Sequence, residues 1–232
     1  MARAVGRPLE PGARVLDFGA GAGRHVAEFR AAGYDALGVD QDFTAHEQGS
    51  AELEYLRRID PPAYELPFDA NEFDFVYSFA VMEHVLDPAS ALAEVSRVLR
   101  HDGLSIHLFA SRWRPVETHM KVPFGGRFQC FALMQLWARL GIRNSFQKGL
   151  PATDVALRNT QYCKTGISYP TAWEWELRAG ARFANVSWAE RHYVDATRDV
   201  KLSSRLVAPV IHRAAVERAY RGLHVRALVL AP

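Results

Sequence analysis

The chain has 232 residues, a net charge of +2 and 49% hydrophobic side chains, so it can bury a sizeable core. Two cysteines, Cys130 and Cys163, are too few for a disulfide framework, and without a Cys/His cluster we expect no metal site. No run reaches the ~18 apolar residues of a membrane span, and no signal-peptide core is present. We therefore expect a soluble, cytoplasmic protein in a reduced compartment.

Charge is distributed unevenly along the chain. Residues 1–110 hold 9 basic and 18 acidic side chains, whereas residues 111–170 hold 9 basic and 2 acidic ones. An acidic first half followed by a basic segment indicates two parts with different surroundings or ligands.

Strands and helices alternate over the first 110 residues. Short apolar runs predict the strands, and apolar residues at helical spacing predict the helices between them. In chain order we expect a strand over 14–19, a helix over 24–32, a strand over 36–40, a helix over 44–57, a weak strand near Ile59, a strand over 73–79, a helix over 89–99 and a strand over 103–110. Such alternation is typical of an α/β fold with a parallel sheet, and the continuous apolar strands predict helices on both faces.

The pattern changes at residue 111. Residues 111–170 are rich in proline and glycine and contain one predicted helix, over 128–140. The alternation then resumes with a helix over 171–179, a strand over 183–190, a helix over 203–220 and a closing strand over 224–230. We therefore expect a core over 1–110, an inserted substrate-binding lid over 111–170, and the rest of the core sheet over 171–232.

A glycine-rich turn follows the first predicted strand. In Val15–Gly23, Asp17 precedes three alternating glycines, which permit a tight turn and a close approach of the backbone to a ligand. Asp40 ends the next strand, where nucleotide-binding sheets hydrogen-bond ribose hydroxyls. The dinucleotide pattern Gly-x-Gly-x-x-Gly is not met, because Arg24 and Val26 stand where its last glycine would be. A ligand with a ribose and an ammonium group but no pyrophosphate, such as S-adenosylmethionine (SAM), fits this pattern.

Five segments in order resemble the core of the class I SAM-dependent methyltransferases of the type 11 family. They are Val15–Gly23, Leu37–Asp40, Leu66–Phe68 followed by Phe73-Asp74, Val81–Pro88 and Leu99–Gly103. The resemblance implies a Rossmann-like fold with seven mostly parallel strands, an antiparallel last strand and a lid inserted after strand five. It also implies SAM as the methyl donor and S-adenosyl-L-homocysteine (SAH) as its product.

The resemblance assigns the glycine turn to the cofactor. Gly19, Ala20, Gly21 and Gly23 would wrap the amino-acid part of SAM, and Asp17 would support that turn. These positions match the family motif residue by residue.

Four other residues take cofactor positions by the same resemblance. Asp40 would hold the ribose, Gln41 would lie beside the adenine, and Phe79 would contact the cofactor at the end of the fourth strand. The pair that the family places before Leu-Pro-Phe to hold the adenine is absent, so Asp60 is expected there in a shifted register. Related enzymes have helices before the glycine motif that close over SAM, whereas 13 residues precede Arg14. Either the insert supplies the lid or the chain begins late.

Candidate catalytic residues are few. Positioning can supply much of the acceleration of methyl transfer, ~7–11 kcal/mol at best. A general base adds ~10²–10⁴ when the acceptor is a hydroxyl. His84, after the fourth strand, and His119, in the insert beside Glu117, are the candidate bases, and His107 is a weaker one. For each of them a structural or surface histidine is the alternative.

The sequence features that bear on the methyl acceptor lie in the insert, residues 111–170. Its arginines, such as Arg112 and Arg127, are interleaved with aromatics, such as Trp113 and Phe128. They form either a solvated basic face or a pocket for an anionic, hydroxyl-rich substrate. Nucleic acid is disfavoured because no nucleic-acid module is recognisable.

These patterns lead us to expect O-methylation of a small polar or glycan-like acceptor, an anionic one if the basic pocket exists. Two alternatives stay open: an N- or C-methyltransferase of a secondary metabolite, and a non-catalytic SAM-fold binding or scaffold protein. A homodimer is also left open.

Overall fold

A computed structural model describes residues 1–42, 54–60, 64–197 and 225–232 of the chain. The helix predicted over 203–220 lies outside the described residues, and so does most of the helix predicted over 44–57. Every statement about structure below concerns the described residues.

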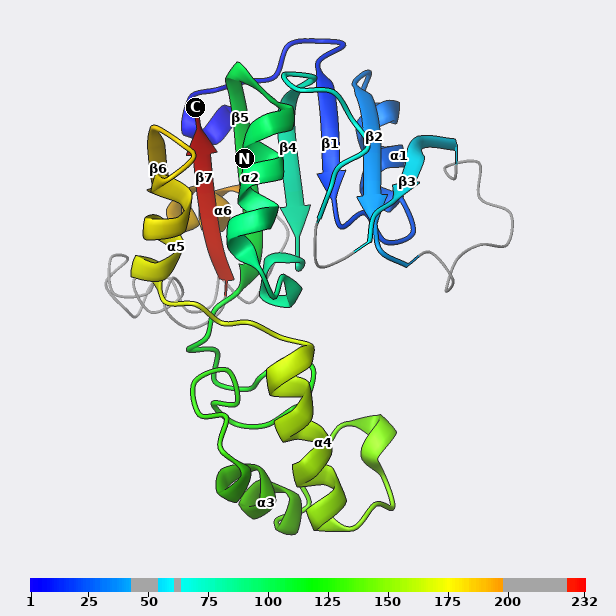
Figure 1. Ribbon diagram of the computed structural model, residues 1–232, viewed down its shortest axis with the longest axis vertical. Helices are drawn as coiled ribbons and strands as arrows, with labels where there is room; N and C mark the ends of the chain where they lie inside the picture. Colours follow the sequence, from blue (N-terminus) through cyan, green and yellow to red (C-terminus); the bar gives the residue numbers. More distant parts are fainter. Residues whose placement is uncertain (43–53, 61–63, 198–224) are drawn as a thin grey trace.

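The core is a seven-stranded sheet in the order β3-β2-β1-β4-β5-β7-β6 (Figure 1). Its strands are β1 (Arg14–Phe18), β2 (Asp35–Asp40), β3 (Leu56–Arg58), β4 (Phe73–Phe79), β5 (Leu99–Ala110), β6 (Asn185–Trp188) and β7 (Val225–Ala231). Strands β1 to β5 pair in parallel, and β7 runs antiparallel to both of its neighbours. This confirms the predicted mostly parallel sheet with an antiparallel last strand.

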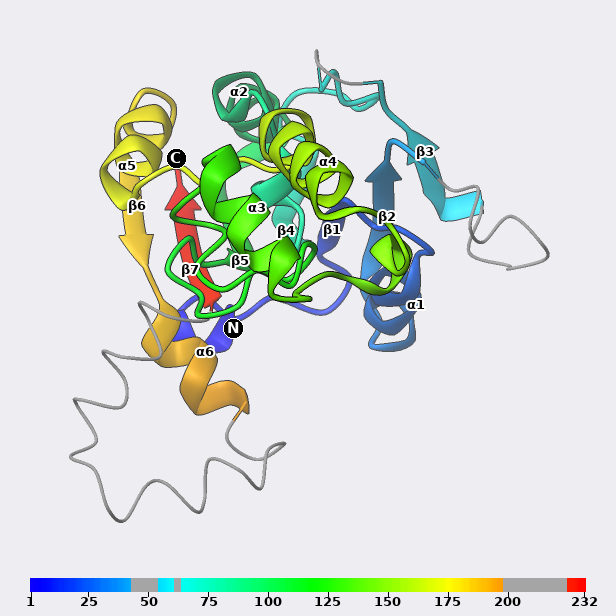
Figure 2. The ribbon, with the colours of Figure 1, turned by 90° about the horizontal axis from the view of Figure 1, so that it is seen from below.

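Helices cover both faces of the sheet because the strands are apolar on both sides. Figure 2 shows α2 (Pro88–Val98) and α5 (Ala172–Gly180) on one face, and α1 (Arg24–Ala31) and α6 (Glu190–Thr197) on the other. Along β1 the side chains alternate, so that Leu16 packs into one hydrophobic cluster and Val15 into the other. The helices and strands therefore enclose two cores, one on each side of the sheet.

Local sequence signals define several helix ends. Asp87 caps α2 by accepting hydrogen bonds from the backbone N–H groups of Ala89 and Ser90, and Pro88 occupies the first helical position. Thr171 and Glu174 form a capping box at the start of α5. These caps fix where the chain leaves the carboxyl edge of the sheet and enters each helix.

The segment over 111–170 leaves the carboxyl end of β5 and lies beyond that edge of the sheet (Figure 1). It contains α3 (Phe131–Arg139), a short 3-10 helix (Ser145–Gln147) and α4 (Ala152–Thr165). Its own small core is made by Met120, Val122, Met134, Ala156 and Ile167. The segment thus has separate packing, and its role as a substrate-binding lid stays a prediction.

The expectation of a single helix in this segment is wrong. α4 was missed because only Val155, Ala156 and Asn159 of its residues are buried, so its apolar stripe is short. Asn159 accepts a hydrogen bond from the Gln147 amide at 2.6 Å, which replaces apolar packing at one buried position. α6 was missed as well, and β5 begins at Leu99, within the span predicted as helix. None of the helices is long and apolar enough to cross a membrane in the part of the chain described.

His107 lies in the centre of the sheet on β5 and is fully buried. Its Nδ1 lies 2.8 Å from the Ser78 hydroxyl and its Nε2 lies 2.7 Å from the Ser105 hydroxyl. Burial lowers the pKa of His107 to about 3. The histidine is therefore neutral and held within the fold, away from the cofactor cavity described below.

The low pKa of His107 predicts acid sensitivity. An unfolded histidine takes up a proton near pH 6.5, whereas the folded one does so near pH 3, so stability is lost as the pH falls between these values. The loss is roughly 1 kcal/mol per pH unit. We expect His107→Gln to have a shallower fall in its unfolding free energy, measured in urea from about pH 7 to about pH 4. His101→Gln, an exposed position on the same strand, is the control; equal slopes for both variants would contradict this account.

Candidate functional site

The glycine turn joins β1 to α1 at the carboxyl edge of the sheet. The φ angles of Gly19, Gly21 and Gly23 are 84°, 52° and 79°, a region that favours glycine. The N–H groups of Gly19 and Ala20 donate to the Val39 carbonyl at 2.8 and 2.9 Å, which ties the turn to β2. A Cβ atom on Gly21 would meet nothing within 4 Å, so this backbone is open to a ligand.

Asp40 ends β2 and holds the turn from the side. One carboxylate oxygen accepts the Gly21 N–H at 2.7 Å, and the other accepts the N–H groups of Gln41 and Asp42 at 2.7 and 3.2 Å. A carboxylate has about four lone-pair sites. Asp40 therefore fixes the turn and keeps about one acceptor position for a ligand hydroxyl.

Asp17 lies directly beneath the turn at the end of β1. Its side chain is 1% exposed, and neither carboxylate oxygen has a hydrogen-bond partner. The Nδ1 atom of His25 lies 3.7 Å from one of these oxygens. Burial, with a contribution from the charge of Asp40, raises the pKa of Asp17 to about 7. An unpartnered buried carboxyl of this kind suits a cationic group of a ligand.

A cavity of about 190 Å³ opens beside the turn. It is lined by Phe18, Gly19, Asp40, Gln41, Ile59, Tyr64, Phe79, Ala80, Val81, His84 and Val85. The structure thus brings four of the predicted cofactor residues and one predicted base to one cavity, because they lie at the carboxyl ends of adjacent parallel strands.

Asp60 is not among these lining residues. Its side chain is 92% exposed, and its carboxylate lies 3.8 Å from the Arg58 guanidinium. Its place beside the adenine stays a prediction. The lining residues that sequence reasoning missed are apolar or aromatic, and Tyr64 and Ala80 adopt φ angles of 51° and 57°. Non-glycine residues with left-handed backbone conformations are frequent at functional sites, but no sequence pattern predicts them.

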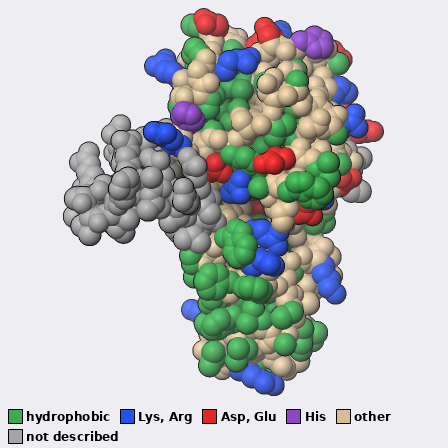
Figure 3. Space-filling view, turned by 90° about the vertical axis from the view of Figure 1, so that its left-hand side faces the viewer, with side chains coloured by type: hydrophobic (Ala, Val, Ile, Leu, Met, Phe, Trp, Pro, Cys, Tyr) green, Lys and Arg blue, Asp and Glu red, His purple; other side chains and the backbone are tan. Residues whose placement is uncertain are grey.

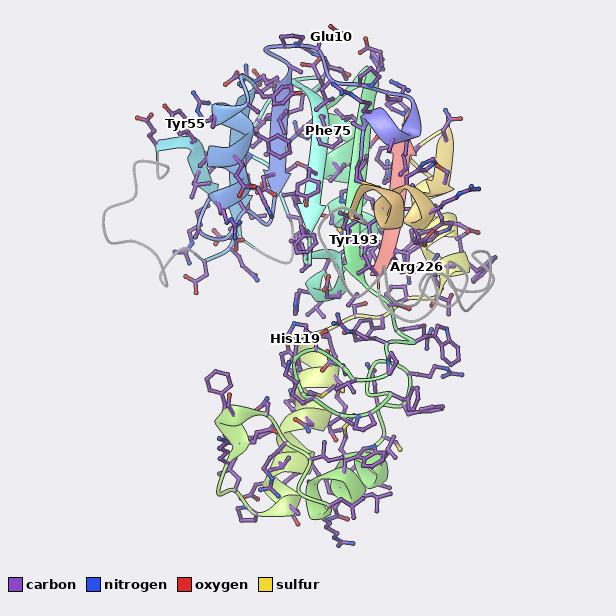
Figure 4. The ribbon with its side chains drawn as sticks, turned by 180° about the vertical axis from the view of Figure 1, so that it is seen from behind. Glu10, Tyr55, Phe75, His119, Tyr193 and Arg226 are labelled. Carbon is purple, nitrogen blue, oxygen red and sulfur yellow. The ribbon has the colours of Figure 1, made fainter. Side chains whose placement is uncertain are left out.

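His84 and His119 meet at the mouth of this cavity. Their rings lie edge to face with centroids 4.6 Å apart, one from the core and the other from the insert. The Nδ1 atom of His84 donates to the Gly166 carbonyl at 2.7 Å, which leaves Nε2 as the acceptor of the neutral ring. Figure 4 shows His119 at the end of the insert that faces the sheet. The two candidates were independent in the sequence, and the fold places them in contact.

Glu117 orients His119. Its carboxylate lies 2.8 Å from His119 Nδ1 and accepts hydrogen bonds from the Tyr169 hydroxyl and the Met120 N–H. Burial alone would raise the pKa of Glu117, but these hydrogen bonds hold it below its usual value. The result is a charged carboxylate that fixes one ring nitrogen and leaves the other free for a substrate.

Glu83 is a second buried carboxyl at the same junction. One oxygen accepts the Ala110 N–H at 3.4 Å, and the other has no partner. Burial raises its pKa. In the part of the chain described, no group of three or more histidine, cysteine or carboxylate side chains is placed to hold a metal ion.

The strand order with an antiparallel β7, together with a glycine turn and an acidic residue at the end of β2, defines a Rossmann-like domain, a class in which this edge of the sheet binds nucleoside-containing cofactors. Residues 16–107 match the family described as "Methyltransferase domain". This match confirms, for residues 16–107, the resemblance to the type 11 SAM-dependent methyltransferases that the motifs predicted.

Two curated relatives illustrate the extent of the match. The O-methyltransferase cnsE of Penicillium expansum is 32% identical over 110 residues, which are 43% of this chain and 40% of that protein. The uncharacterized methyltransferase YcgJ of Bacillus subtilis is 35% identical over 95 residues, or 39% of this chain and 38% of that protein. The match thus spans about 40% of the length of these relatives.

Two solved structures have a fold similar to that of this chain over nearly its whole length. The B. subtilis YcgJ structure covers 98% of this chain and 94% of its own, with a TM-score of 0.50 and 18% identity. Phosphoethanolamine N-methyltransferase 2 of Haemonchus contortus, solved with S-adenosyl-L-methionine, covers 97% of this chain and 50% of its own, with a TM-score of 0.51 and 13% identity. At these identities the likeness concerns the fold alone.

Gly19 should tolerate no side chain. Its φ of 84° and the 88° of Gly33 make alanine cost about 1–2 kcal/mol at either position. Only at Gly19 would the new Cβ collide, 2.2 Å from a Val81 methyl group, which adds about 1–3 kcal/mol of overpacking. We expect Gly19→Ala to lower the unfolding free energy more than Gly33→Ala does, measured by urea denaturation. Equal losses would contradict the clash, and Val81→Ala should recover part of the difference.

Proposed function

We propose that the chain transfers a methyl group from SAM to a hydroxyl of a small polar or glycan-like acceptor, with His84 and His119 as the basic residues. The observation that carries this proposal is the cavity itself. His84 lines it together with Gly19 and Asp40, and the ring of His119 touches His84 from the insert. Predicted cofactor residues and a candidate base therefore line the same cavity.

The residues around the glycine turn fit SAM chemically. The buried, unpartnered carboxyl of Asp17 suits the ammonium group of the methionine part. The remaining acceptor position of Asp40 suits a ribose hydroxyl. Phe79 and Tyr64 offer aromatic faces in the same cavity. When bound, SAM supplies an electrophilic methyl group on a positively charged sulfur.

The histidines supply the proton acceptor that a hydroxyl needs. The Nδ1–H of His84 is held by the Gly166 carbonyl, so Nε2 can accept a proton without a change of tautomer. His119, held by the Glu117 carboxylate, can carry a positive charge next to it. Glu117 acts here as a positioning residue. Oriented neighbours of this kind are what general-base catalysis requires.

The relatives do not select the acceptor atom. By name, one is an O-methyltransferase and another an N-methyltransferase. The preference for a hydroxyl rests on the histidine pair, because an amine that is already neutral needs no base before attack. An N-linked product would therefore replace this part of the proposal without affecting the cofactor site.

Asp17 should make cofactor binding depend on pH. Its pKa of about 7 means that the carboxyl is neutral below that pH and must lose a proton before it can pair with an ammonium group. We expect the affinity for SAH to rise with pH by up to about tenfold per unit below pH 7 and to level off above it. Calorimetric titration with SAH measures this dependence.

Asp17→Asn should bind SAH weakly and without this pH dependence. Asp154→Asn, an exposed position on α4, serves as the matched control and should behave like the unmodified protein. A pH profile of Asp17→Asn identical to that of the unmodified protein would separate Asp17 from the cofactor. Absence of any calorimetric heat for SAH would favour a non-catalytic protein.

His84 and His119 should control turnover. The acceptor is first found by mass spectrometry of a cell extract incubated with the protein and isotopically labelled SAM. With that acceptor, we expect His119→Asn and His84→Asn to lower kcat by ~10²-fold or more, as loss of a general base does. Glu117→Gln should lower it less and shift its pH profile, while SAH affinity is kept in His119→Asn and Glu117→Gln. Full activity in both histidine variants would overturn the general-base assignment.

A further inference from the structure

A second cavity of about 290 Å³ lies between the sheet and the insert, next to Arg226 of β7. One wall is the carboxyl end of β5, residues 109–111, and the opposite wall is the chain that returns from the insert, residues 168–172. Its most polar lining residues are Arg112, Arg127 and Arg226. Figure 3 shows Lys and Arg side chains gathered between the sheet and the insert, next to hydrophobic ones.

The charged side chains that line this cavity are all basic. No Asp or Glu is among the described residues that line it. The Nε–H of Arg112 and the Nε1–H of Trp175 are buried without a hydrogen-bond partner, and Trp175 is 1% exposed. Neither group can accept, so each needs an acceptor atom, from a ligand or from water. Unpaired buried donors of this kind are rare in proteins.

The three arginines differ in how they are compensated. Arg226 donates to the Glu190 carboxylate at 2.6 Å and lies over the Trp188 ring. Arg127 lies 5.2 Å from the centroids of both the Trp113 and Phe128 rings, in cation–π geometry. Arg127 thus offers positive charge beside aromatic faces, which is the arrangement that binds a planar anion next to apolar carbon. Arg112 lines the same cavity and interacts electrostatically with Glu174.

The two cavities are connected through Glu83. The Ser168 N–H, in the wall of the second cavity, donates to the Glu83 carbonyl at 2.6 Å. A carboxylate oxygen of Glu83 accepts the N–H of Ala110 in the opposite wall, and the next residue, His84, lines the cofactor cavity. The two cavities therefore lie on either side of the Glu83–His84 segment.

We infer that the second cavity binds an anionic group, a carboxylate or a phosphate, of the methyl acceptor, through Arg112 and Arg127. This inference rests on the proposed methyltransferase function and adds the chemical class of its substrate. Trp113, which is 46% exposed, covers the apolar part of the same molecule. Arg112 and Arg127 of the insert then form a binding site and are not part of a solvated basic face.

Tryptophan fluorescence tests the inference, because Trp113 and Trp175 line the cavity. The full chain is titrated at constant ionic strength with inorganic phosphate in one arm and with benzoate in the other. We expect a saturable change in at least one arm, and the responding arm distinguishes phosphate from carboxylate. In Arg112→Gln/Arg127→Gln the affinity should fall about 10- to 100-fold, as expected when hydrogen bonds to a charged group are lost.

Arg139→Gln/Arg158→Gln is the matched control, since it removes two exposed charges of the same insert outside the cavity and should keep the response. SAH titration of the same samples separates the two proposals. If SAH binds and neither anion gives a saturable response, or if both double variants respond alike, the anion site is overturned and the cofactor site stands. If SAH does not bind, the proposed function itself fails. Unchanged SAH affinity in Arg112→Gln/Arg127→Gln shows that the variant is folded.

Discussion

The carboxylate of Asp40 is the interaction on which the rest of the site depends. It accepts the Gly21 N–H at 2.7 Å and so joins the ends of two parallel strands at the point where the chain turns into α1. With the bonds from Gly19 and Ala20 to the Val39 carbonyl, it orders three glycines in left-handed conformations, which matters because glycine loses more backbone entropy on ordering than any other residue. Asp40 thus orders the turn and aligns it with the cavity.

Three buried carboxyl groups near the site differ in pKa because they have different hydrogen-bond partners. Asp17 has no hydrogen-bond partner, and burial raises its pKa to about 7. Glu83 has one unpaired oxygen, and its pKa is raised as well. Glu117 is buried to the same degree, yet its pKa is lowered because several donors surround it. Carboxyl groups that are buried to a similar degree therefore differ in pKa according to the number of hydrogen-bond donors around them.

The insert is joined to the core by few but specific contacts. His84 binds the Gly166 carbonyl, Glu83 binds the Ser168 N–H, and the rings of His84 and His119 touch. All these contacts lie at the carboxyl edge of the sheet, between the two cavities. A lid role for the insert agrees with this position, because these three contacts border the proposed site.

The sheet and the glycine turn could both be predicted from the sequence. Both rest on local signals: apolar strands, glycines at fixed spacing, and acidic residues at strand ends. The sequence did not reveal α4, whose buried face is short and partly polar, nor the left-handed residues that line the cavity. It also named His84 and His119 only as separate candidates.

The fold brought His84 into contact with His119, and it placed Arg112 and Trp175, each with an unpaired donor, along one cavity. These residues are far apart in the sequence, and no periodicity relates them. Their proximity arises because parallel strands end at one edge of the sheet and because the insert folds back over that edge. Secondary structure follows from neighbours along the chain, whereas a binding site depends on which strand ends and loops the completed fold places side by side.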